Sequence, residues 1–364
     1  MALPAPHISL RRLAEGTCTQ SLLDDAGGID TPVVTVDLDG EGCRDAAILS
    51  AAADQAECTD RILVGILRGA PAATGDERLP LIRALDVTYT NAPGVTDRST
   101  VPVDDVEAAV HAFAAQSAAN PQAATVLRQV LRIGRRLDVP AAVDVESLAY
   151  STLLGGPEFS RWLTGRGPRP LPPPPTGEAV LVRRGGDELN VTLNRPERRN
   201  AYGARLRDAL TSALTIAVAD TSISRVVLDG AGPSFCAGGD LDEFGTTPDL
   251  TLAHLVRTRG GAGLLVHRLT DRIEARVHGA CVGGGIEIPA FAGRVVAAED
   301  AWFRLPEVEM GLIPGAGGTV SIPRRIGRWR AMHLFVTGAR LDARTALGWG
   351  LVDAVSGPAP ETPR

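Results

Sequence analysis

The sequence predicts an α/β fold built from repeated units of two strands and a helix, and three segments carry this prediction. Residues 179–194 alternate apolar and polar side chains around a Gly-Gly pair, which is typical of a β-hairpin. Residues 201–220 carry apolar side chains at helical spacing, and residues 224–232 form a short apolar run that ends in Gly-Ala-Gly. The same succession recurs around "RIEARVHGACVGGGIE" and "RVVAAEDAWFRL", which indicates a repeated ββα unit.

A proline-rich stretch divides the chain. Residues 165–178 read "GRGPRPLPPPPTGE", and proline at this density favours an extended connector over a helix or a central strand. We therefore expect an N-terminal region at 1–164, a linker at 165–178 and a core at 179–364. Two domains also fit a length of 364 residues.

The N-terminal region resembles a degraded version of the core. "TPVVTVDLDG" (31–40) matches "ELNVTLNRPE" (188–197), and "RILVGILRGAP" (61–71) matches "SRVVLDGAGP" (224–233) at a similar offset. An internal duplication explains this similarity, as does the general likeness of strands in any α/β chain. The first copy has no glycine-rich loop followed by a glutamate, so we expect no chemistry from it.

Residues 104–164 carry apolar side chains at helical spacing and predict three or four helices. Asp144, just before "VESLAY", is the expected N-cap of one of them, and Gly-Gly-Pro at 155–157 is the expected break.

Composition excludes several classes of function. The net charge is −6 and all 37 basic residues are arginine, so neither nucleic-acid binding nor Schiff-base chemistry by a lysine is expected. The five cysteines contain no CxxC pair, which is typical of thiols in a reducing compartment. No cluster has metal-ligand spacing, and no apolar run is long enough for a signal peptide or a bilayer span. We expect a cytoplasmic protein without a metal or a membrane partner.

Two glycine loops are the first candidates for a functional site. "SFCAGGDLDEF" (234–244) and "HGACVGGGIE" (278–287) each follow an expected strand. Each is predicted to free backbone N–H groups at the start of a helix, where the helix dipole favours negative charge. Two such loops that converge would stabilise an oxyanion. Each loop taken singly is equally compatible with an ordinary strand-to-helix turn, and neither matches the dinucleotide fingerprint.

Two glutamates accompany these loops. Glu287 closes the second loop, and Glu307 lies in "FRLPEVEMGLIPGAGGT" (303–319), beside a further glycine loop. Paired carboxylates next to an oxyanion site suit the addition or removal of water, or proton transfer next to a carbonyl. The alternative is two surface glutamates, although both stand among apolar residues and glycines.

Taken together, the motifs of residues 179–355 resemble the enoyl-CoA hydratase/isomerase (crotonase) superfamily. They follow in order as "LNRPERRNAY", "GAGPSFCAGGDLDEF", "VHGACVGGGIE", "LPEVEMGLIPGAGGT" and "RRIGRWRAMHLFVTGARLDARTALGWGLVDAV". The resemblance implies a crotonase-like spiral of ββα units over about half the chain. It also implies an acyl-CoA substrate, a homo-oligomer (trimer or hexamer) and a role in fatty acid metabolism.

The resemblance assigns residues by position. It implies that Gly239 and Gly284 donate the two oxyanion N–H groups, that Glu287 and Glu307 are the catalytic carboxylates, and that Gly315 helps to hold the water or the substrate α-carbon. It implies no permanently bound cofactor, because coenzyme A arrives as part of the thioester. The residues that it places against coenzyme A are Arg198, Arg199, Ala201, Ala237, Asp240 and Leu241. The two arginines are also compatible with ordinary solvated charges.

Since both glutamates are present, the expected reaction is hydration or dehydration of a 2-enoyl-CoA. The alternatives are double-bond isomerisation, thioester hydrolysis, decarboxylation, cofactor-free oxygenation of an aryl-acetyl-CoA, or a scaffold that kept the fold. The absence of glutamate at position 287 in the oxygenating relatives argues against that alternative.

The chain also departs from the family pattern. Pro289 forces the helix after the glycine triplet to start near Gly285, because proline is tolerated only in a first turn. The resemblance implies further helices after "GLVDAV", and residues 120–163 of this sequence resemble those helices. We therefore expect helices of 104–164 to pack on the 179–355 core, within the same subunit or a neighbouring one.

Overall fold

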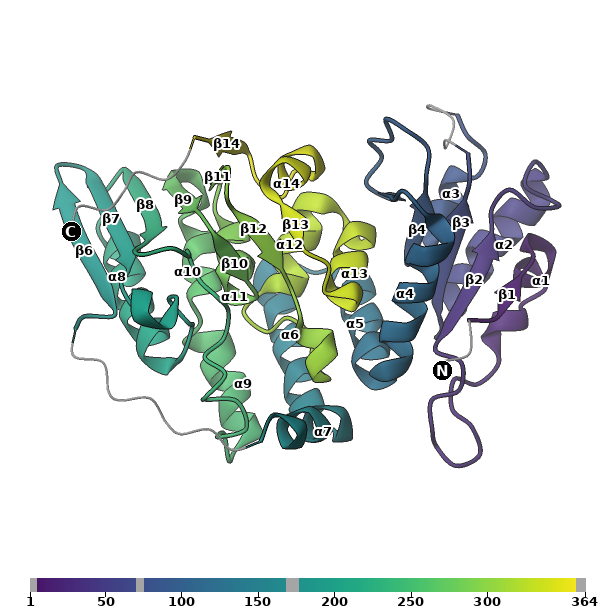
Figure 1. The fold of residues 1–364 in the computed structure, drawn as a ribbon, viewed down its shortest axis with the longest axis horizontal. Coiled ribbons are helices and arrows are strands. Elements are labelled where there is room, and N and C mark those ends of the chain that lie inside the picture. The colour runs from purple at the N-terminus through teal and green to yellow at the C-terminus, as the bar shows by residue number, and fades with distance from the viewer. Residues whose placement is uncertain (1–4, 70–74, 168–176, 358–364) are drawn as a thin grey trace.

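The computed structural model describes residues 5–69, 75–167 and 177–357, so most of the expected linker lies outside the described residues (Figure 1). The N-terminal part is built on a five-stranded sheet in which all neighbouring strands are parallel and follow chain order. The strands are β1 (His7–Ile8), β2 (Val33–Asp37), β3 (Ile62–Leu67), β4 (Val87–Thr90) and β5 (Val101–Pro102). Every residue of β3 is buried, which accounts for its unbroken apolar run.

Helices cover both faces of this sheet, and the alternation along β3 shows how. Leu63 and Leu67 belong to the small apolar cluster formed with α1 (Leu10–Ala14), α2 (Ala46–Cys58) and α3 (Leu79–Ala84). Ile62, Val64 and Ile66 point to the opposite face and join the large cluster that contains α4 (Val106–Ala119). The second face therefore belongs to the main core of the molecule.

Four helices follow the sheet, as the sequence predicts. They are α4, α5 (Pro121–Gly134), α6 (Val139–Leu154) and α7 (Pro157–Arg166). The expected N-cap at Asp144 is wrong: α6 begins at Val139, and Asp138 accepts the Ala141 N–H as its N-cap. Pro140 in the first turn suits that earlier start, so Asp144 lies inside the helix.

The C-terminal part contains a six-stranded sheet in the order β14-β11-β9-β8-β7-β6. Only the expected hairpin of β6 (Val180–Gly185) and β7 (Glu188–Leu193) is antiparallel, and the other pairs are parallel. The other strands are β8 (Arg225–Gly230), β9 (Ile273–Val277), β11 (Arg294–Ala298) and β14 (Ala354–Ser356). The fold is thus mixed α/β, as predicted, whereas the spiral arrangement and the degenerate copy stay predictions.

Within the described residues 177–357, a three-stranded sheet and seven α-helices complete this part. The sheet consists of β10 (Ala280–Val282), β12 (Trp302–Arg304) and β13 (Leu341–Asp342). The helices are α8 (Ala204–Ala219), α9 (Leu250–Arg259), α10 (Ala262–Arg268), α11 (Gly284–Glu287), α12 (Gly318–Ile326), α13 (Arg328–Thr337) and α14 (Ala343–Trp349). Two of them, α11 and α12, begin at glycine loops, and both loops lead to the site described below.

The two parts of the chain share one core. In Figure 1 the helices α4, α5 and α6 lie between the N-terminal sheet and the C-terminal strands. Tyr89 of β4 is hydrogen-bonded to His333 of α13 at 2.9 Å. The buried Asp86 lies 3.5 Å from Arg328 of α13 and also pairs with Arg128 and Arg132. Burial raises the pKa of Asp86, but these arginines outweigh that effect and hold it at about 2. Helices of 104–164 therefore pack on the core of the same chain; the division into two domains stays a prediction.

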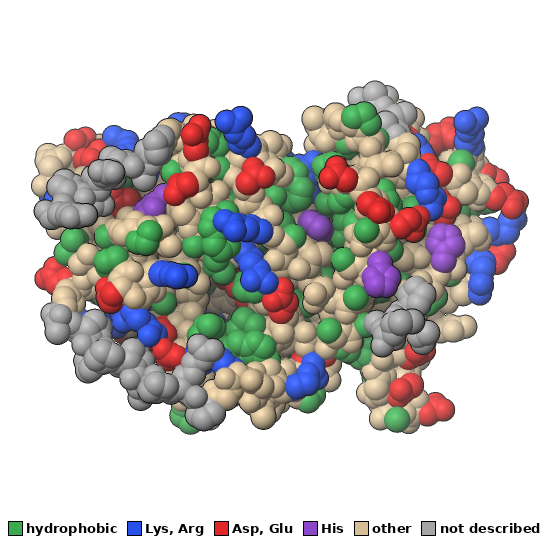
Figure 2. Space-filling view, in the orientation of Figure 1, with side chains coloured by type: hydrophobic (Ala, Val, Ile, Leu, Met, Phe, Trp, Pro, Cys, Tyr) green, Lys and Arg blue, Asp and Glu red, His purple; other side chains and the backbone are tan. Residues whose placement is uncertain are grey.

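The surface shows no segregation of charge on the face in Figure 2, where arginine side chains alternate with aspartate and glutamate. Among the helices in the described part of the chain, none combines the length and the hydropathy that crossing a bilayer requires.

Candidate active site

The two glycine loops lie side by side. Val282 of β10 donates its N–H to the Cys236 carbonyl at 3.0 Å, and Cys236 donates to the Ala280 carbonyl at 3.2 Å. These bonds place Gly239 and Gly284 on the wall of a single cavity of about 430 Å³. No described residue accepts the Gly239 N–H, and the Gly284 N–H lies in the first turn of α11, where no intrahelical acceptor exists. The helix expected after the first loop is replaced by turns, so only the second loop opens a helix.

The glycine triplet has two members that the packing requires and one that it does not. A β-carbon at Gly283, where φ is +48°, would stand 2.6 Å from Oε1 of Glu307. A β-carbon at Gly285 would overlap the Cys236 carbonyl. At Gly284, by contrast, no atom lies nearer than 3.7 Å, and the residue faces the cavity. The surrounding protein would therefore tolerate a side chain at Gly284. A side chain there would occupy part of the cavity, which its absence keeps open.

Glu287 is held firmly by backbone groups. It is the last residue of α11 and only 2% exposed. Its Oε2 accepts the N–H groups of Ala316 at 2.7 Å and Gly318 at 2.9 Å. Burial raises the pKa of Glu287 to about 7, against the opposing effect of these hydrogen bonds. The helix does start at Gly284, as Pro289 predicts, and Pro289 itself opens a separate 3₁₀ turn.

Glu307 has the opposite environment. It opens a 3₁₀ turn behind Pro306, and its buried Oε2 has no hydrogen-bond partner among the described residues. Burial, and after it the charge of Glu287, raises the pKa of Glu307 well above its usual value. Glu287 is thus the first of the two to lose its proton as the pH rises, and Glu307 is the one favoured as an acid.

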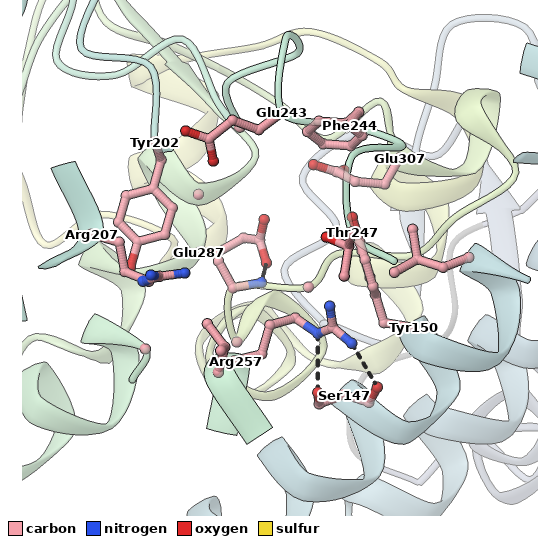
Figure 3. Close-up of a pocket in the computed structure, with 18 of the residues that line it drawn as sticks. Ser147, Tyr150, Tyr202, Arg207, Glu243, Phe244, Thr247, Arg257, Glu287 and Glu307 are labelled. Atoms are coloured by element: carbon pink, nitrogen blue, oxygen red, sulfur yellow. Dashed lines mark hydrogen bonds between the residues drawn. The ribbon is translucent and has the colours of Figure 1, made fainter. Parts of the chain in front are cut away.

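The two carboxylates face the same space (Figure 3). The β-carbon position at Gly283 lies 2.6 Å from Oε1 of Glu307 and 3.6 Å from Oε1 of Glu287, so both oxygens lie within 4 Å of one point. Gly315 lines the same cavity, under the ring of Tyr150, where a β-carbon would stand 2.5 Å from the ring. The structure therefore brings together all five expected catalytic residues.

A third buried carboxylate in this site was missed by sequence reasoning. Glu146 of α6 is 1% exposed and lines the cavity. It accepts the N–H of Gly317 at 2.7 Å, and the N–H and hydroxyl of Thr319 at 2.8 and 2.7 Å. Burial and the nearby Glu287 raise the pKa of Glu146 to about 8 against these bonds. The available signal was the helical spacing, because Glu146 and Ser147 lie on the same face as the buried Val143.

The residues expected to bind coenzyme A lie mostly outside the cavity wall, and their role stays a prediction. Asp240 lines the cavity, and the remaining five do not. Arg198 donates to Asp240 and Asp242, at 2.6 Å each. Arg199 is exposed, and its carbonyl accepts the Ala237 N–H. Ala201 and Leu241 likewise lie outside the cavity wall. Arg198 is thus adjacent to the cavity through Asp240, but its guanidinium already has two carboxylate partners.

No metal centre is apparent in the described residues, where no three His, Cys, Asp or Glu side chains gather in a suitable group. What gathers instead is a set of buried carboxylates next to glycine loops with free N–H groups. On an α/β scaffold, such a site is typical of an enzyme that moves protons on a small-molecule substrate.

Comparison with known proteins identifies the family. The sequence model of the enoyl-CoA hydratase/isomerase family matches residues 188–360. "Probable enoyl-CoA hydratase echA8" of Mycobacterium bovis is 36% identical over 182 residues, which cover 50% of this chain and 69% of the relative. The 2,3-dehydroadipyl-CoA hydratase of Escherichia coli is 38% identical over 176 residues, which cover 48% of this chain and 68% of the relative. A crystal structure of an enoyl-CoA hydratase from Mycobacterium tuberculosis is 36% identical, covers 50% of this chain and 71% of its own, and has a TM-score of 0.45. The chain belongs to the enoyl-CoA hydratase/isomerase family.

Proposed function

We propose that the protein catalyses the reversible addition of water to the double bond of a 2-enoyl-CoA. The observation that carries this proposal is the pair Glu287 and Glu307, which both line the cavity and whose Oε1 atoms both lie within 4 Å of the β-carbon position at Gly283. Hydration adds a hydroxyl to the β-carbon and a proton to the neighbouring α-carbon. It therefore needs two acid/base groups that lie close together.

The glycine loops supply the electrostatic part of the reaction. The thioester oxygen would accept the N–H groups of Gly239 and Gly284, so that charge developing on an enolate is stabilised. One such donor is typically worth about 3–4 kcal/mol. In support, the N–H of Gly239 has no acceptor among the described residues.

The two glutamates divide the proton transfers. Glu287, fixed as an acceptor by Ala316 and Gly318, takes a proton from the attacking water, whose oxygen bonds to the β-carbon. Glu307, whose pKa is raised well above its usual value, gives its proton to the α-carbon of the enolate. The proton on Glu287 then restores Glu307, so no other reactant is consumed.

The N-terminal region is assigned a structural role in this proposal. We infer that its strands descend from a second family domain, and that α4–α7 act as the helical cover of the core. The similarity of the β2 and β3 segments to the β7 and β8 segments supports this descent. The contribution of Glu146 and Tyr150 to the cavity wall supports the covering role. Assembly into trimers or hexamers and a cytoplasmic location stay predictions, which light scattering and cell fractionation test.

The direct test is an assay of the purified full chain with a panel of 2-enoyl-CoA esters. Hydration is measured as the loss of absorbance from the conjugated thioester. Hydration of at least one ester is expected. Exclusive production of free coenzyme A, or no turnover of any ester, would refute the proposal.

A further inference from the structure

Arg257 of α9 lies in the cavity wall together with Glu287 and Glu307. Two of its nitrogens are engaged by α6: Nε donates to the Ser147 hydroxyl at 3.0 Å, and Nη2 donates to the Ser147 carbonyl and to the Ser151 hydroxyl. The guanidinium also lies over the ring of Tyr150, at 4.6 Å from its centroid. Its position is therefore fixed by three neighbours on one helix.

This guanidinium has no anionic partner in the described part of the chain, where no carboxylate oxygen lies within 4.0 Å of it. Its Nη1 has no protein acceptor there, and Figure 3 shows the free edge of the group turned toward the space between Glu287 and Tyr150. The other cavity arginine, Arg207, differs, because it pairs with Asp208 at 2.7 Å. Arg259, two residues further along α9, pairs with Asp144 at 3.0 Å.

A purely structural role would explain only part of this arrangement. Bridging α9 to α6 uses Nε and Nη2, which the two serines satisfy. It gives no reason for a cation whose remaining N–H groups face a cavity, since even a partly buried charge without a partner loses hydration. The N–H groups of Nη1 are left to donate to a carboxylate, and the hydrogen bonds made by Nε and Nη2 orient them for that contact. The ligand is thus the natural source of the missing anion.

We propose that Arg257 binds a carboxylate at the far end of the acyl chain, so that the preferred substrates are coenzyme A monothioesters of unsaturated dicarboxylic acids. This inference rests on the proposed hydration and narrows its substrate class. Ser147, Ser151 and Tyr150 are positioning residues in it, because each holds the guanidinium in place.

The test compares two substrates of equal chain length, 2-hexenoyl-CoA and its counterpart with a carboxylate in place of the terminal methyl group. The wild-type protein is expected to have the higher kcat/KM for the carboxylate. Arg257→Gln should lower the ratio of the two kcat/KM values by about 10- to 100-fold, as expected for loss of a hydrogen bond to a charged group. Arg257→Lys keeps the charge without the planar guanidinium. Its ratio of kcat/KM values should lie between those of the wild type and Arg257→Gln.

Arg259→Gln is the matched control, because it removes an arginine of the same helix that pairs with α6 outside the cavity. It should leave the ratio unchanged. An equal loss on both substrates in Arg257→Gln would overturn the inference, since it indicates contact with coenzyme A or a structural role. So would a wild-type preference for the methyl-ended chain, which does not depend on any variant folding. If the wild type hydrates no 2-enoyl-CoA ester at all, the proposed function itself fails.

Discussion

Glu146 and Thr319 lie 173 residues apart in the sequence and are joined by two hydrogen bonds at the wall of the cavity. Glu146 belongs to α6 of the N-terminal helices, and Thr319 to the first turn of α12. The same loop donates to Glu287 through Ala316 and Gly318. Glu146, from the N-terminal half of the chain, therefore positions the loop that holds the Glu287 carboxylate in the C-terminal half.

Replacing Glu146 with glutamine should disturb this loop. Three donors converge on the two oxygens of Glu146, and the amide of glutamine would turn an N–H group toward one of them. We expect Glu146→Gln to lower the free energy of unfolding by about 1–3 kcal/mol, because a buried donor loses its partner. Turnover by the folded protein should fall about 10-fold or more, since the loop sets the position of Glu287.

Glu158→Gln is the control for that variant. Glu158 of α7 is also buried, and it accepts the N–H groups of Gln122 and Ala123 away from the cavity. Chemical denaturation and steady-state kinetics should show a loss of stability in both variants and a loss of turnover only in Glu146→Gln. Equal turnover per folded molecule in the two variants would mean that Glu146 has no positioning role.

The glycine triplet gives a second prediction. Gly284→Ala should fold with a melting temperature close to that of the wild type, because no atom lies within 3.7 Å of the added methyl group. Its kcat/KM should fall about 10-fold or more, because the methyl group occupies the space where the thioester is proposed to lie. Gly285→Ala should instead lose about 1–3 kcal/mol of stability through its overlap with Cys236. Wild-type kinetics in Gly284→Ala would contradict the proposed oxyanion site.

The pH dependence of kcat/KM follows from the pKa values of the two glutamates. Activity should rise as the pH passes about 7, because Glu287 must lose its proton to accept one from water. It should fall again at higher pH, because Glu307 must keep its proton to donate it. The bell-shaped profile reports apparent values of the pair. Activity that does not change between about pH 5 and about pH 9, roughly two units on either side of neutrality, would exclude this division of roles.

Stability should depend on pH in the opposite sense to that of a salt-bridged acid. The pKa of Glu146 is raised by burial to about 8 in the folded protein, so folded molecules retain a proton that unfolded chains lose near pH 4.5. Its contribution is therefore fully present below about pH 4.5 and is lost as the pH rises toward 8. Denaturation midpoints at a series of pH values should decline less steeply in Glu146→Gln than in the wild type. The same slope in both proteins would assign the decline to other groups.

The parts of the site that were predicted from sequence are those encoded by neighbouring residues. Gly283, Gly284, Gly285 and Glu287 occupy one turn, where backbone conformation and side chain are specified together. Glu146 and Arg257 reach the cavity only because α6 and α9 pack against each other, and no local pattern in either helix indicates that contact. The start of α6 was misplaced for a related reason, since Asp138 and Asp144 are equally good caps in isolation.

The residues assigned to coenzyme A show the limit of assignment by position. Arg198 occupies the expected place in the chain, but Asp240 and Asp242 take up its charge in this protein. A motif fixes where a residue stands in the backbone, whereas its partners depend on side chains contributed by other segments.

The central claim, that Glu287 and Glu307 together hydrate an enoyl thioester, is tested most directly by assaying Glu287→Gln and Glu307→Gln for two reactions. Hydration of a 2-enoyl-CoA should fall by about 10²- to 10⁴-fold in either variant, as expected for loss of an acid or base catalyst. Isomerisation of a 3-enoyl-CoA, if it occurs, should depend chiefly on Glu307. Hydration at the wild-type rate in either folded variant would contradict the account.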